Sequence, residues 1–400
     1  VLISLDLWQR TWQWFLFKRL LIILVSAILV IVIVLLLLDP ILKPEYKNKD
    51  ECKSYGTLEL LCGLQNPEDF AEIPGENAVI VSQFSGLAEL NYGETKPGIL
   101  SRMNLDTREI EDYQIRFELD NNLGIGEEGC EPFEGLYPHG IDVYQNISIR
   151  DESFSPFLKE AHLLAVVNHQ LVDRIEFFLF FSDQVVFSDS SARELFWVGC
   201  VAGPKNSTYF NDVVISDENG SFYATHQYDK DWGFSKLFIF NIFRWDTGYV
   251  YEWSKETGYS ILNNSEGAWP NGIEMISDTV FVSFRMNGSI SAINNNGERK
   301  DLKFRSYLDG GSDNIIAKGE ELWIAVQDTN FGGLTCMEPN QIQCATPFSV
   351  IRTDADLNII EEINFGDVSF GGLSVVYPHN NELFLGSYKS DRIAIYNTND

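Results

Sequence analysis

The sequence predicts an all-β fold, a six-bladed β-propeller, preceded by a single transmembrane α-helix. A long apolar run lies near the N-terminus, and the rest of the chain contains short β-rich runs separated by Gly, Asn, Asp and Ser clusters. No long amphipathic helix pattern follows the apolar run. We therefore divide the chain into an N-terminal segment (1–19), a transmembrane helix (20–38), a stalk (39–65) and the propeller (66–400).

The run from Leu20 to Leu38 contains only Leu, Ile, Val, Ala and Ser26, and as a helix it is about 28 Å long, enough to cross a bilayer. A cleaved signal peptide would have a shorter apolar core that ends in small residues, whereas this run ends in Leu-Leu-Leu-Leu-Asp-Pro. A buried core helix would carry a polar stripe, which these residues lack. The run is therefore expected to anchor the chain in membrane lipid.

The charges before the run indicate its orientation. Arg10, Lys18 and Arg19 are opposed only by Asp6, so the N-terminus is expected in the cytosol and the propeller in the periplasm, a lumen or the exterior. Lysines beyond the run weaken this signal, but acidic residues are interleaved with them and large domains translocate regardless of charge. The aromatic residues that suit a membrane interface are Trp8, Trp12, Trp14, Phe15 and Phe17.

Charge and cysteine content narrow the partners. The formal net charge of -29 disfavours nucleic acid and anionic lipid and favours cations. The six cysteines are an even number that could form three bridges in an oxidising compartment, with fifteen possible connectivities. Local spacing favours Cys336 with Cys344 and Cys52 with Cys62, which leaves Cys130 for Cys200. No CxxC pair exists, so a zinc site is not expected.

A recurring unit predicts the propeller, because an apolar strand leads repeatedly through a polar turn into a second strand. The pairs are Leu163–Val167 with Arg174–Phe180, Phe281–Phe284 with Ser289–Ile293, Leu383–Leu385 with Arg392–Tyr396, and more loosely Tyr223–Thr225 with Lys236–Ile239. Intervals of roughly fifty to sixty residues are typical of four-stranded blades with their loops, and the length suits six of them. A β-sandwich is the alternative, but sandwich strands lack this period.

Polar clusters recur where the first strand of a unit begins, and a propeller would gather them around its axis. They are Pro67-Glu68-Asp69, Pro138-His139-Gly140-Ile141, Asn168-His169, Asn211-Asp212, Pro270-Asn271-Gly272 and Asp313-Asn314. Each alone is an ordinary turn sequence. Together they supply carboxylate and amide oxygens, which are the ligands that calcium prefers.

These clusters, with the strands beside them, resemble the paraoxonase family in the same order along the chain. The similarity extends from about Glu68 to Tyr396. Its motifs are Pro67–Pro74, Gly135–Ile141, Leu163–His169, Asn211–Val214, Phe222–Thr225, Asn271–Ile273 and Asp313–Ile315.

The resemblance implies a six-bladed propeller with two calcium ions in its central tunnel and hydrolysis of lactones and aryl esters. By resemblance, the residues of the catalytic calcium near the mouth would be Glu68, Asn211, Asn271, Asp313 and Asn314. The deeper, structural calcium would be held by Asp69, Asp212 and the backbone carbonyl of Ile141. His139 and His169 match the family's histidine pair.

The chemistry of these residue types agrees with the resemblance. Calcium with an open position polarises a carbonyl, and a neutral imidazole can deprotonate an attacking water near pH 7. We expect His139 to be that base and His169 to orient it or relay its proton. The alternative is that His169 has only a structural role at the end of a strand. No GxSxG elbow supports a serine nucleophile.

The chain also departs from the family. Paraoxonases usually close the propeller with a disulfide to a cysteine at the very end, but this chain ends Ile395-Tyr396-Asn397-Thr398-Asn399-Asp400. Closure must use hydrogen bonds alone, or another bridge substitutes. Ile149–Glu160 and Gly332–Ala345 read as insertions, and loops over such a tunnel set the substrate range.

Two functions fit these patterns. The first is a calcium-dependent hydrolase that acts on a small lactone or ester. The second is a non-catalytic, calcium-stabilised propeller that serves as a binding or assembly subunit, with its helix docked against a membrane protein partner. The histidine pair favours the enzyme.

Overall fold

The computed structural model describes residues 14, 16–33, 51–54, 56–86, 96–117, 123–147, 161–181, 193–305, 310–327, 342–343, 345–366 and 369–399. The chain divides into two compact units, Val1–Lys47 and Asn48–Asp400. In the first unit the helix Leu16–Ile33, exposed along its length, is long and apolar enough to cross a membrane. The sequence placed this span at Leu20–Leu38, and residues 34–38 lie outside the described residues.

The second unit is a six-bladed β-propeller, as the sequence predicts. Blade 1 contains β2 (Pro67–Glu72), β3 (Ala78–Gln83), β4 (Ile99–Asn104) and β5 (Ile110–Asp112). Blade 2 contains β7 (Pro138–Tyr144), β8 (Ala161–Asn168), β9 (Arg174–Phe181) and β10 (Glu194–Ala202), with β6 (Gln114–Arg116) parallel to β10. Blade 3 contains β11 (Phe210–Ile215), β12 (Phe222–His226), β13 (Tyr249–Ser254) and β14 (Gly258–Ile261).

The remaining blades follow the same plan. Blade 4 contains β15 (Pro270–Ile276), β16 (Thr279–Phe284), β17 (Ser289–Asn294) and β18 (Arg299–Lys303). Blade 5 contains β19 (Gly311–Lys318), β20 (Glu321–Gln327), β21 (Phe348–Asp354) and β22 (Ile359–Phe365). Blade 6 contains β23 (Leu373–His379), β24 (Glu382–Ser387), β25 (Arg392–Asn397) and, as its outer strand, β1 (Leu58–Cys62).

Apolar clusters between neighbouring blades hold the ring together. Six such clusters exist, and each joins the facing sides of two adjacent blades. Middle strands such as β8 and β9 are therefore buried on both faces and read as nearly continuous apolar runs. This explains why the strand pairs of the repeat are visible in the sequence.

The first strand of every blade faces the axis and carries the same irregularity. These inner strands contact one another in the cyclic order β2, β7, β11, β15, β19 and β23. Each has a β-bulge about one residue after its start, where it shifts register against the next strand of its blade. A bulge adds an unpaired residue and redirects its side chain. The repeated bulges therefore direct the polar clusters of the sequence toward the axis of the propeller.

Over blades 1 to 5, larger residues alternate with glycine at the second residue of the bulge. Blades 1, 3 and 5 place Asp69, Asp212 and Asn314 there, whereas blades 2 and 4 place Gly140 and Gly272. A Cβ atom at Gly140 would lie 2.5 Å from the Cα atom of Asp212, and one at Gly272 would lie 2.5 Å from that of Asn314. The tunnel is thus too narrow at this level for a side chain from every blade.

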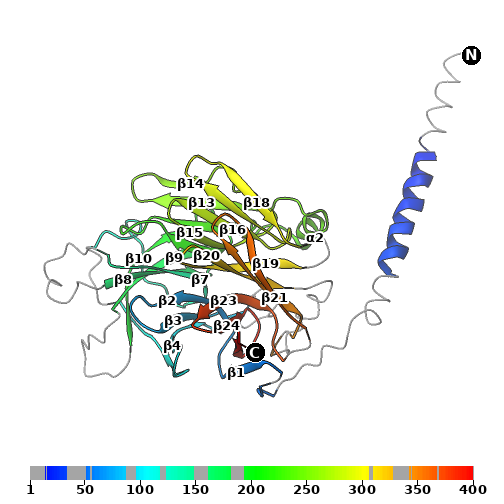
Figure 1. The fold of residues 1–400 in the computed structure, drawn as a ribbon. Coiled ribbons are helices and arrows are strands. Elements are labelled where there is room, and N and C mark those ends of the chain that lie inside the picture. Colours follow the sequence, from blue (N-terminus) through cyan, green and yellow to red (C-terminus); the bar gives the residue numbers. More distant parts are fainter. Residues whose placement is uncertain are drawn as a thin grey trace, which may run out of the picture. The chain divides into compact units, whose positions relative to one another are not determined.

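The ring is closed by backbone hydrogen bonds between β1 and β25. They pair antiparallel from Leu58 with Tyr396 to Cys62 with Arg392, and Figure 1 shows β1 beside the C-terminus. Of the two closures left open by the sequence, the structure uses hydrogen bonding. The last part of the expected stalk, residues 58–62, is therefore a strand of blade 6.

The described cysteines pair as the spacing suggests, Cys52 with Cys62 and Cys130 with Cys200. Cys336, Cys344 and residues 148–160 lie outside the described residues, as does most of the second expected insertion. One expected strand is wrong, because Lys236–Ile239 belongs to the helix α2 (Phe234–Phe243) and β12 pairs instead with β13.

The tight approach at Gly272 generates a stability prediction. We expect Gly272→Ala to lower the free energy of unfolding by about 3 kcal/mol, because the added Cβ atom meets backbone that cannot move without opening the tunnel. Thermal or denaturant unfolding measures this change. The control is Gly366→Ala, whose Cβ atom would meet nothing within 4 Å. Equal stabilities of the two variants would contradict the argument.

Candidate active site

Five side chains form a ring at the tunnel mouth, which is the end where the inner strands begin. They are the first bulge residues of blades 1 to 5, and we call them the mouth ring: Glu68, His139, Asn211, Asn271 and Asp313. All five are buried, with at most 5% exposed. Blade 6 contributes Ser374, whose hydroxyl donates to the Glu68 carbonyl oxygen at 2.6 Å. The five residues expected to hold the calcium of the mouth therefore lie at one site: four belong to the mouth ring, and Asn314 follows Asp313.

Four oxygens of this site have no hydrogen-bond donor among the described residues. They are Glu68 Oε2, Asn211 Oδ1, Asn271 Oδ1 and Asn314 Oδ1. The side-chain nitrogen of Asn314, in contrast, donates to Glu68 Oε1 at 3.1 Å. Only the oxygen of this amide group therefore has no partner. A buried acceptor without a donor costs about 1–3 kcal/mol. Four of them at one place form a donor set that suits a hard cation such as calcium.

Carboxylates alone do not make this donor set. Among the described residues, His, Cys, Asp and Glu side chains form no group of three that could hold a metal ion. Asparagine oxygens supply three of the four orphaned positions. Calcium accepts such neutral amide oxygens together with carboxylates, in a geometry that need not be rigid.

Asp313 is tied to an arginine that the sequence did not indicate. Nη1 of Arg285 lies 2.9 Å from Asp313 Oδ2, and Nη2 of the same guanidinium donates to Gln327 Oε1 at 2.8 Å. Gln327 Nε2 also donates to Asp313 Oδ2. Burial raises the pKa of Asp313 to about 6 even though Arg285 opposes the rise. Arg285 thus holds Asp313 in place and brings one positive charge to the mouth.

Asp69 and Asp212 lie one residue further along their strands, where each bridges two blades. Asp69 Oδ2 accepts the Ile141 N–H, and Asp212 Oδ2 accepts the Ile273 N–H, both at 2.8 Å. Ile141 is therefore at the expected place, but the bond that reaches Asp69 comes from its amide nitrogen. Burial raises the pKa of both carboxyls well above the ordinary value, and for Asp212 the charge of Asp69 adds to this effect.

Two further carboxyls in the tunnel were missed by sequence reasoning. Asp142 of β7 accepts the Ile215 N–H at 2.7 Å, and Glu274 of β15 accepts the Ala317 N–H at 3.0 Å. Burial raises their pKa values to about 6 and about 8, and for Glu274 the charge of Asp142 contributes next. The sequence pattern that could have indicated them is a single acidic residue in an inner strand, soon after the bulge, with apolar residues around it.

Together these six residues form what we call the carboxyl column: Glu68, Asp313, Asp69, Asp212, Asp142 and Glu274. Of the lysines and arginines that the structure describes, Arg285 is the one paired with a member of this column. One guanidinium cannot balance six negative charges, four of which belong to fully buried side chains, Glu68, Asp69, Asp212 and Asp313. The column must therefore either retain protons or bind cations.

A chain of polar groups leads away from the mouth ring. His139 Nδ1 lies 2.6 Å from His169 Nε2, and His169 Nδ1 lies 3.1 Å from Asp173 Oδ2. Lys230 Nζ contacts Asp173 Oδ1 at 2.6 Å. The His139 ring stacks on Phe84 and the His169 ring on Tyr209, with centroid distances of 4.5 and 4.7 Å. Both imidazoles are thereby held in fixed orientations.

The ionisation of this chain determines its proton positions. Burial lowers the pKa of His139 to about 4 and also lowers that of His169, so both are neutral near pH 7. Burial by itself raises the pKa of Asp173, but His169 and Lys230 together hold it below its usual value. An ionised Asp173 at 3.1 Å favours the tautomer with its proton on His169 Nδ1, and His169 Nε2 then accepts the Nδ1 proton of His139. The lone pair of His139 is left on Nε2.

That lone pair faces the mouth ring. His139 Nε2 lies 3.5 Å from Glu68 Oε1 and 3.4 Å from Asn211 Nδ2. His139 Nε2 therefore lies beside two side chains of the donor set. Asp173 and Lys230, which sequence reasoning missed, lie behind His169 and fix the orientation of the two imidazoles.

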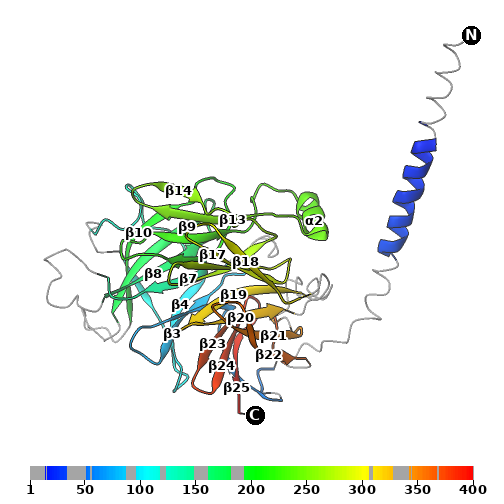
Figure 2. The same cartoon turned by 45° about the horizontal axis from the view of Figure 1, so that its top comes forward.

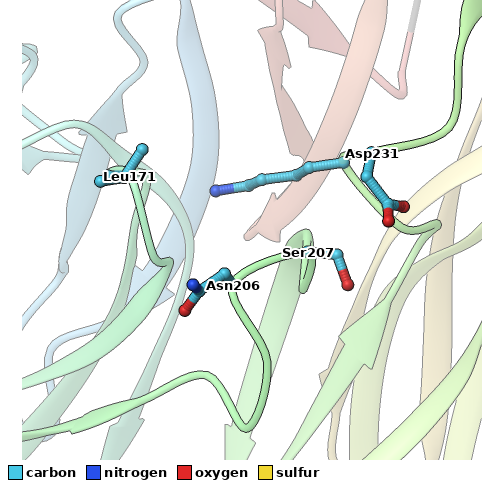
Figure 3. A pocket seen from close by; sticks show the side chains of 5 residues that line it. Leu171, Asn206, Ser207 and Asp231 are labelled. Carbon is cyan, nitrogen blue, oxygen red and sulfur yellow. The ribbon is translucent and has the colours of Figure 1, made fainter.

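The outer side of this chain borders an open depression on the surface. Its lining is Leu171, Asn206, Ser207, Lys230 and Asp231, and Figure 3 shows the labelled residues coming from three separate loops. Besides Asp173, the Lys230 ammonium donates to the Gln170 carbonyl oxygen at 2.9 Å. Asp173 is thus fully buried beneath this depression, and Lys230 lies over it.

No protein-family model matches the chain, and no curated protein matches it in sequence. Solved propellers resemble the structure at low identity. The catalytically inactive virginiamycin B lyase of Staphylococcus aureus is 12% identical with a TM-score of 0.44, covering 85% of this chain and 98% of its own. A gluconolactonase of Xanthomonas campestris is 13% identical (0.44; 88% and 93%), and the calcium-binding protein regucalcin of Agrobacterium tumefaciens is 11% identical (0.44; 84% and 90%).

The carboxyl column predicts how stability depends on pH without calcium. Glu68 and Glu274 have folded pKa values of about 8, above their unfolded values near 4.5. Their stabilising contribution is complete below pH 4.5 and is lost as the pH rises toward 8. Above pH 7 the unfolded histidines, whose ordinary pKa is 6.5, are mostly neutral like the folded ones, so they offset only a small part of this loss. We expect the loss to be about 1.4 kcal/mol per pH unit for each carboxyl that keeps its proton only when folded.

Thermal unfolding of the full chain in a chelator, between pH 7 and 8, measures this dependence. The melting temperature should fall with rising pH, and excess calcium should remove most of the slope. A chelated protein whose melting temperature is flat over this range would show that the column carries no retained protons.

Proposed function

We propose that the propeller is a calcium-dependent hydrolase of lactones and related esters, with its active site at the tunnel mouth. The observation that supports this proposal is that His139 Nε2 lies 3.5 Å from Glu68 Oε1 and 3.4 Å from Asn211 Nδ2, on two side chains that also carry orphaned oxygens. The donor set fits calcium because it combines amide and carboxylate oxygens that nothing else among the described residues satisfies. When bound there, calcium supplies an electrophile for a carbonyl oxygen and for the negative charge that develops on it.

In the proposed reaction, His139 would first accept a proton from water and later donate it to the leaving oxygen. His139 Nε2 takes a proton from a water molecule, whose oxygen forms a bond to the carbonyl carbon of the substrate. The bond from that carbon to the ring oxygen or leaving oxygen breaks. His139 returns the proton to the departing oxygen, which gives a hydroxy acid from a lactone, or an acid and an alcohol from an ester.

His169 and Asp173, behind His139, would stabilise His139 while it carries the additional proton. A proton on Nε2 makes the imidazole cationic, and its Nδ1 proton can shift along the 2.6 Å contact toward His169. Asp173 then stabilises the second ring. His169 is therefore assigned as the relay and Asp173 as a positioning residue.

The same proposal gives roles to the other residues at the axis. Glu68, Asn211, Asn271, Asp313 and Asn314 would hold the calcium of the mouth, and Asp69, Asp212 and Ile141 a deeper ion. The helix Leu16–Ile33 would anchor the enzyme, with its N-terminus in the cytosol and the propeller outside. Aryl esters are included as substrates by the resemblance to paraoxonases.

The second candidate is a non-catalytic propeller that keeps calcium for stability and assembles with a membrane protein. The observation that favours it is that Asp69 and Asp212 each bond to the backbone of a neighbouring blade, which is a structural task. It assigns no task to His139 or His169. Catalysis therefore decides between the two candidates.

Hydrolysis of lactones and phenyl esters by the full chain in detergent, with and without a calcium chelator, tests the enzyme directly. We expect activity only with calcium, and we expect His139→Gln to lower kcat/KM by about 100-fold or more, because the base is removed. His379→Gln is the matched control, because His379 is the last residue of β23, at the end opposite the mouth ring, where it contacts Asp106. Activity that survives chelation, or a His139→Gln enzyme as active as His379→Gln, would refute the mechanism.

The tautomers assigned to His139 and His169 lead to a separate prediction for Asp173→Asn. An amide in place of the carboxylate can donate to His169 Nδ1, which favours the opposite tautomer and disrupts the contact to His139. We expect kcat to fall roughly 100-fold with KM little changed.

A second variant separates positioning from folding. Asp173→Asn with Lys230→Met also removes the unpaired ammonium, so the melting temperature should recover while kcat stays low. If kcat recovers together with stability, Asp173 has only a structural role.

A further inference from the structure

A second ring of side chains lies next to the mouth ring. In every blade the last residue of the second strand pairs with the first residue of the inner strand, so the residue that follows the second strand is at the mouth. The residue in blade 5 lies outside the described residues, and we call the others the outer ring: Phe84, His169, Gln227, Arg285 and Tyr388. Two members contact the mouth ring at His139, because Phe84 stacks on it and His169 is bonded to it.

Arg285 is the cation of the outer ring, and it reaches from blade 4 into the next blades. Its guanidinium bonds to Asp313 and Gln327 of blade 5, and its Cζ atom lies 5.2 Å from the ring centroid of Tyr388 in blade 6. Figure 2 shows these neighbouring blades, coloured from yellow to red. The guanidinium is therefore held in one orientation at the mouth.

This guanidinium keeps some capacity to bind a ligand. The side chain of Arg285 is 26% exposed, whereas that of Asp313 is 3% exposed. Among the described residues, its hydrogen-bond partners are Asp313, Gln327 and Tyr388. A guanidinium has more N–H groups than these three partners use. The remaining N–H groups are available to an acceptor that enters the mouth.

Arg285 and the base are on opposite sides of the mouth. His139 belongs to blade 2 and Asp313 to blade 5, which are three blades apart in a ring of six. Arg285 is bonded to Asp313, so its guanidinium is on that side. A substrate whose carbonyl carbon lies near His139 Nε2 therefore extends its far end toward Arg285.

The charges at the mouth favour an anion there once calcium is bound. Arg285 and one calcium ion bring three positive charges against the two negative charges of Glu68 and Asp313. The compensating carboxyls, such as Asp142 and Glu274, lie deeper along the axis. The net charge of -29 on the whole chain is largely screened beyond about 8 Å at physiological ionic strength, so the nearby charges decide which ligand is preferred.

We propose that Arg285 selects lactones and esters that carry a carboxylate, which it binds while the carbonyl to be attacked faces His139. This inference rests on the proposed hydrolase for the reaction that follows binding. The planar fork of an arginine matches a carboxylate with two parallel N–H···O bonds, and such charge-assisted bonds are stronger than neutral ones. Arg285 is thus assigned a role in specificity in addition to the positioning of Asp313.

Binding of a ketone analogue tests this selection without turnover. A cyclopentanone carboxylate has the ring shape of a γ-lactone but no ring oxygen to release, and methyl cyclopentanone is its neutral counterpart. Titration calorimetry of the full chain in detergent, with excess calcium and physiological salt, gives both dissociation constants. We expect the carboxylate to bind about tenfold more tightly or better, and Arg285→Gln to bring the two constants together, because the cation is lost.

Gln327→Leu separates anion binding from the positioning of Asp313. Gln327 also donates to Asp313 Oδ2, so its loss disturbs the same carboxylate but leaves the guanidinium in place. We expect this variant to keep the preference for the carboxylate, and Arg285→Lys to keep part of it. Equal binding of the two ketones by the unaltered protein, a preference that survives in Arg285→Gln, or an equal loss in Gln327→Leu would each overturn the proposal.

Hydrolysis separates this inference from the hydrolase itself. The substrates are a γ-butyrolactone that carries a carboxylate and the same lactone with a methyl group in its place. We expect kcat/KM to favour the carboxylate about tenfold, mainly through KM, and Arg285→Gln to abolish this ratio. If the methyl lactone is cleaved equally well, the hydrolase stands and the selection fails. If neither lactone is cleaved while ketone binding depends on Arg285, the hydrolase fails and the anion site stands.

Discussion

The buried carboxyls that bond from one blade to the next are the interaction on which the propeller depends. Asp69 joins blade 1 to blade 2, Asp142 joins 2 to 3, Asp212 joins 3 to 4, and Glu274 joins 4 to 5. Neutral groups complete the circle, because Gln327 donates to Leu373 in blade 6 and Ser374 donates to Glu68 in blade 1. The inner strands of a propeller are not hydrogen-bonded to one another as sheets, so side chains must make these joints.

This arrangement concentrates negative charge at the axis of the propeller, with four of the carboxyls buried and Asp142 and Glu274 partly exposed. Ionised, the carboxyl column carries six negative charges and Arg285 returns one positive charge. Two calcium ions would return four more, and one retained proton would then bring the column to neutrality; Glu274, with a pKa of about 8, is the member suited to keep it. The count of two ions expected from the resemblance therefore suits the charge of the column. The same cations would stabilise the ring and activate a substrate.

Parts of the molecule that repeat along the chain could be predicted from the sequence, and parts formed by unrelated segments could not. Glu68, His139, Asn211, Asn271 and Asp313 occupy one position of a repeating unit, so their convergence follows from the fold. Arg285 reaches into the next blade and Lys230 reaches back to the preceding one, and no local pattern indicates either contact. The run at Lys236–Ile239 was expected as a strand, because a short apolar run does not distinguish a strand from a helix. β1 was assigned to the stalk because its partner, β25, lies at the other end of the chain.

The polar chain from His139 to Lys230 separates an active site from a purely structural one. It buries two imidazoles, a carboxylate and part of an ammonium side by side, and it also joins blade 2 to blade 3, because Asp173 accepts the Phe210 N–H at 3.0 Å and pairs with Lys230. Apolar side chains of similar volume would hold this part of the propeller at least as well, because burying charged groups costs desolvation that their pairing only partly returns. A propeller that needed calcium only for stability would require the carboxyl column and nothing beyond it. The additional chain also leaves one defined feature, the Nε2 atom of a neutral imidazole beside the Glu68 and Asn211 side chains, and this is the atom that the proposed hydrolase would use as its base.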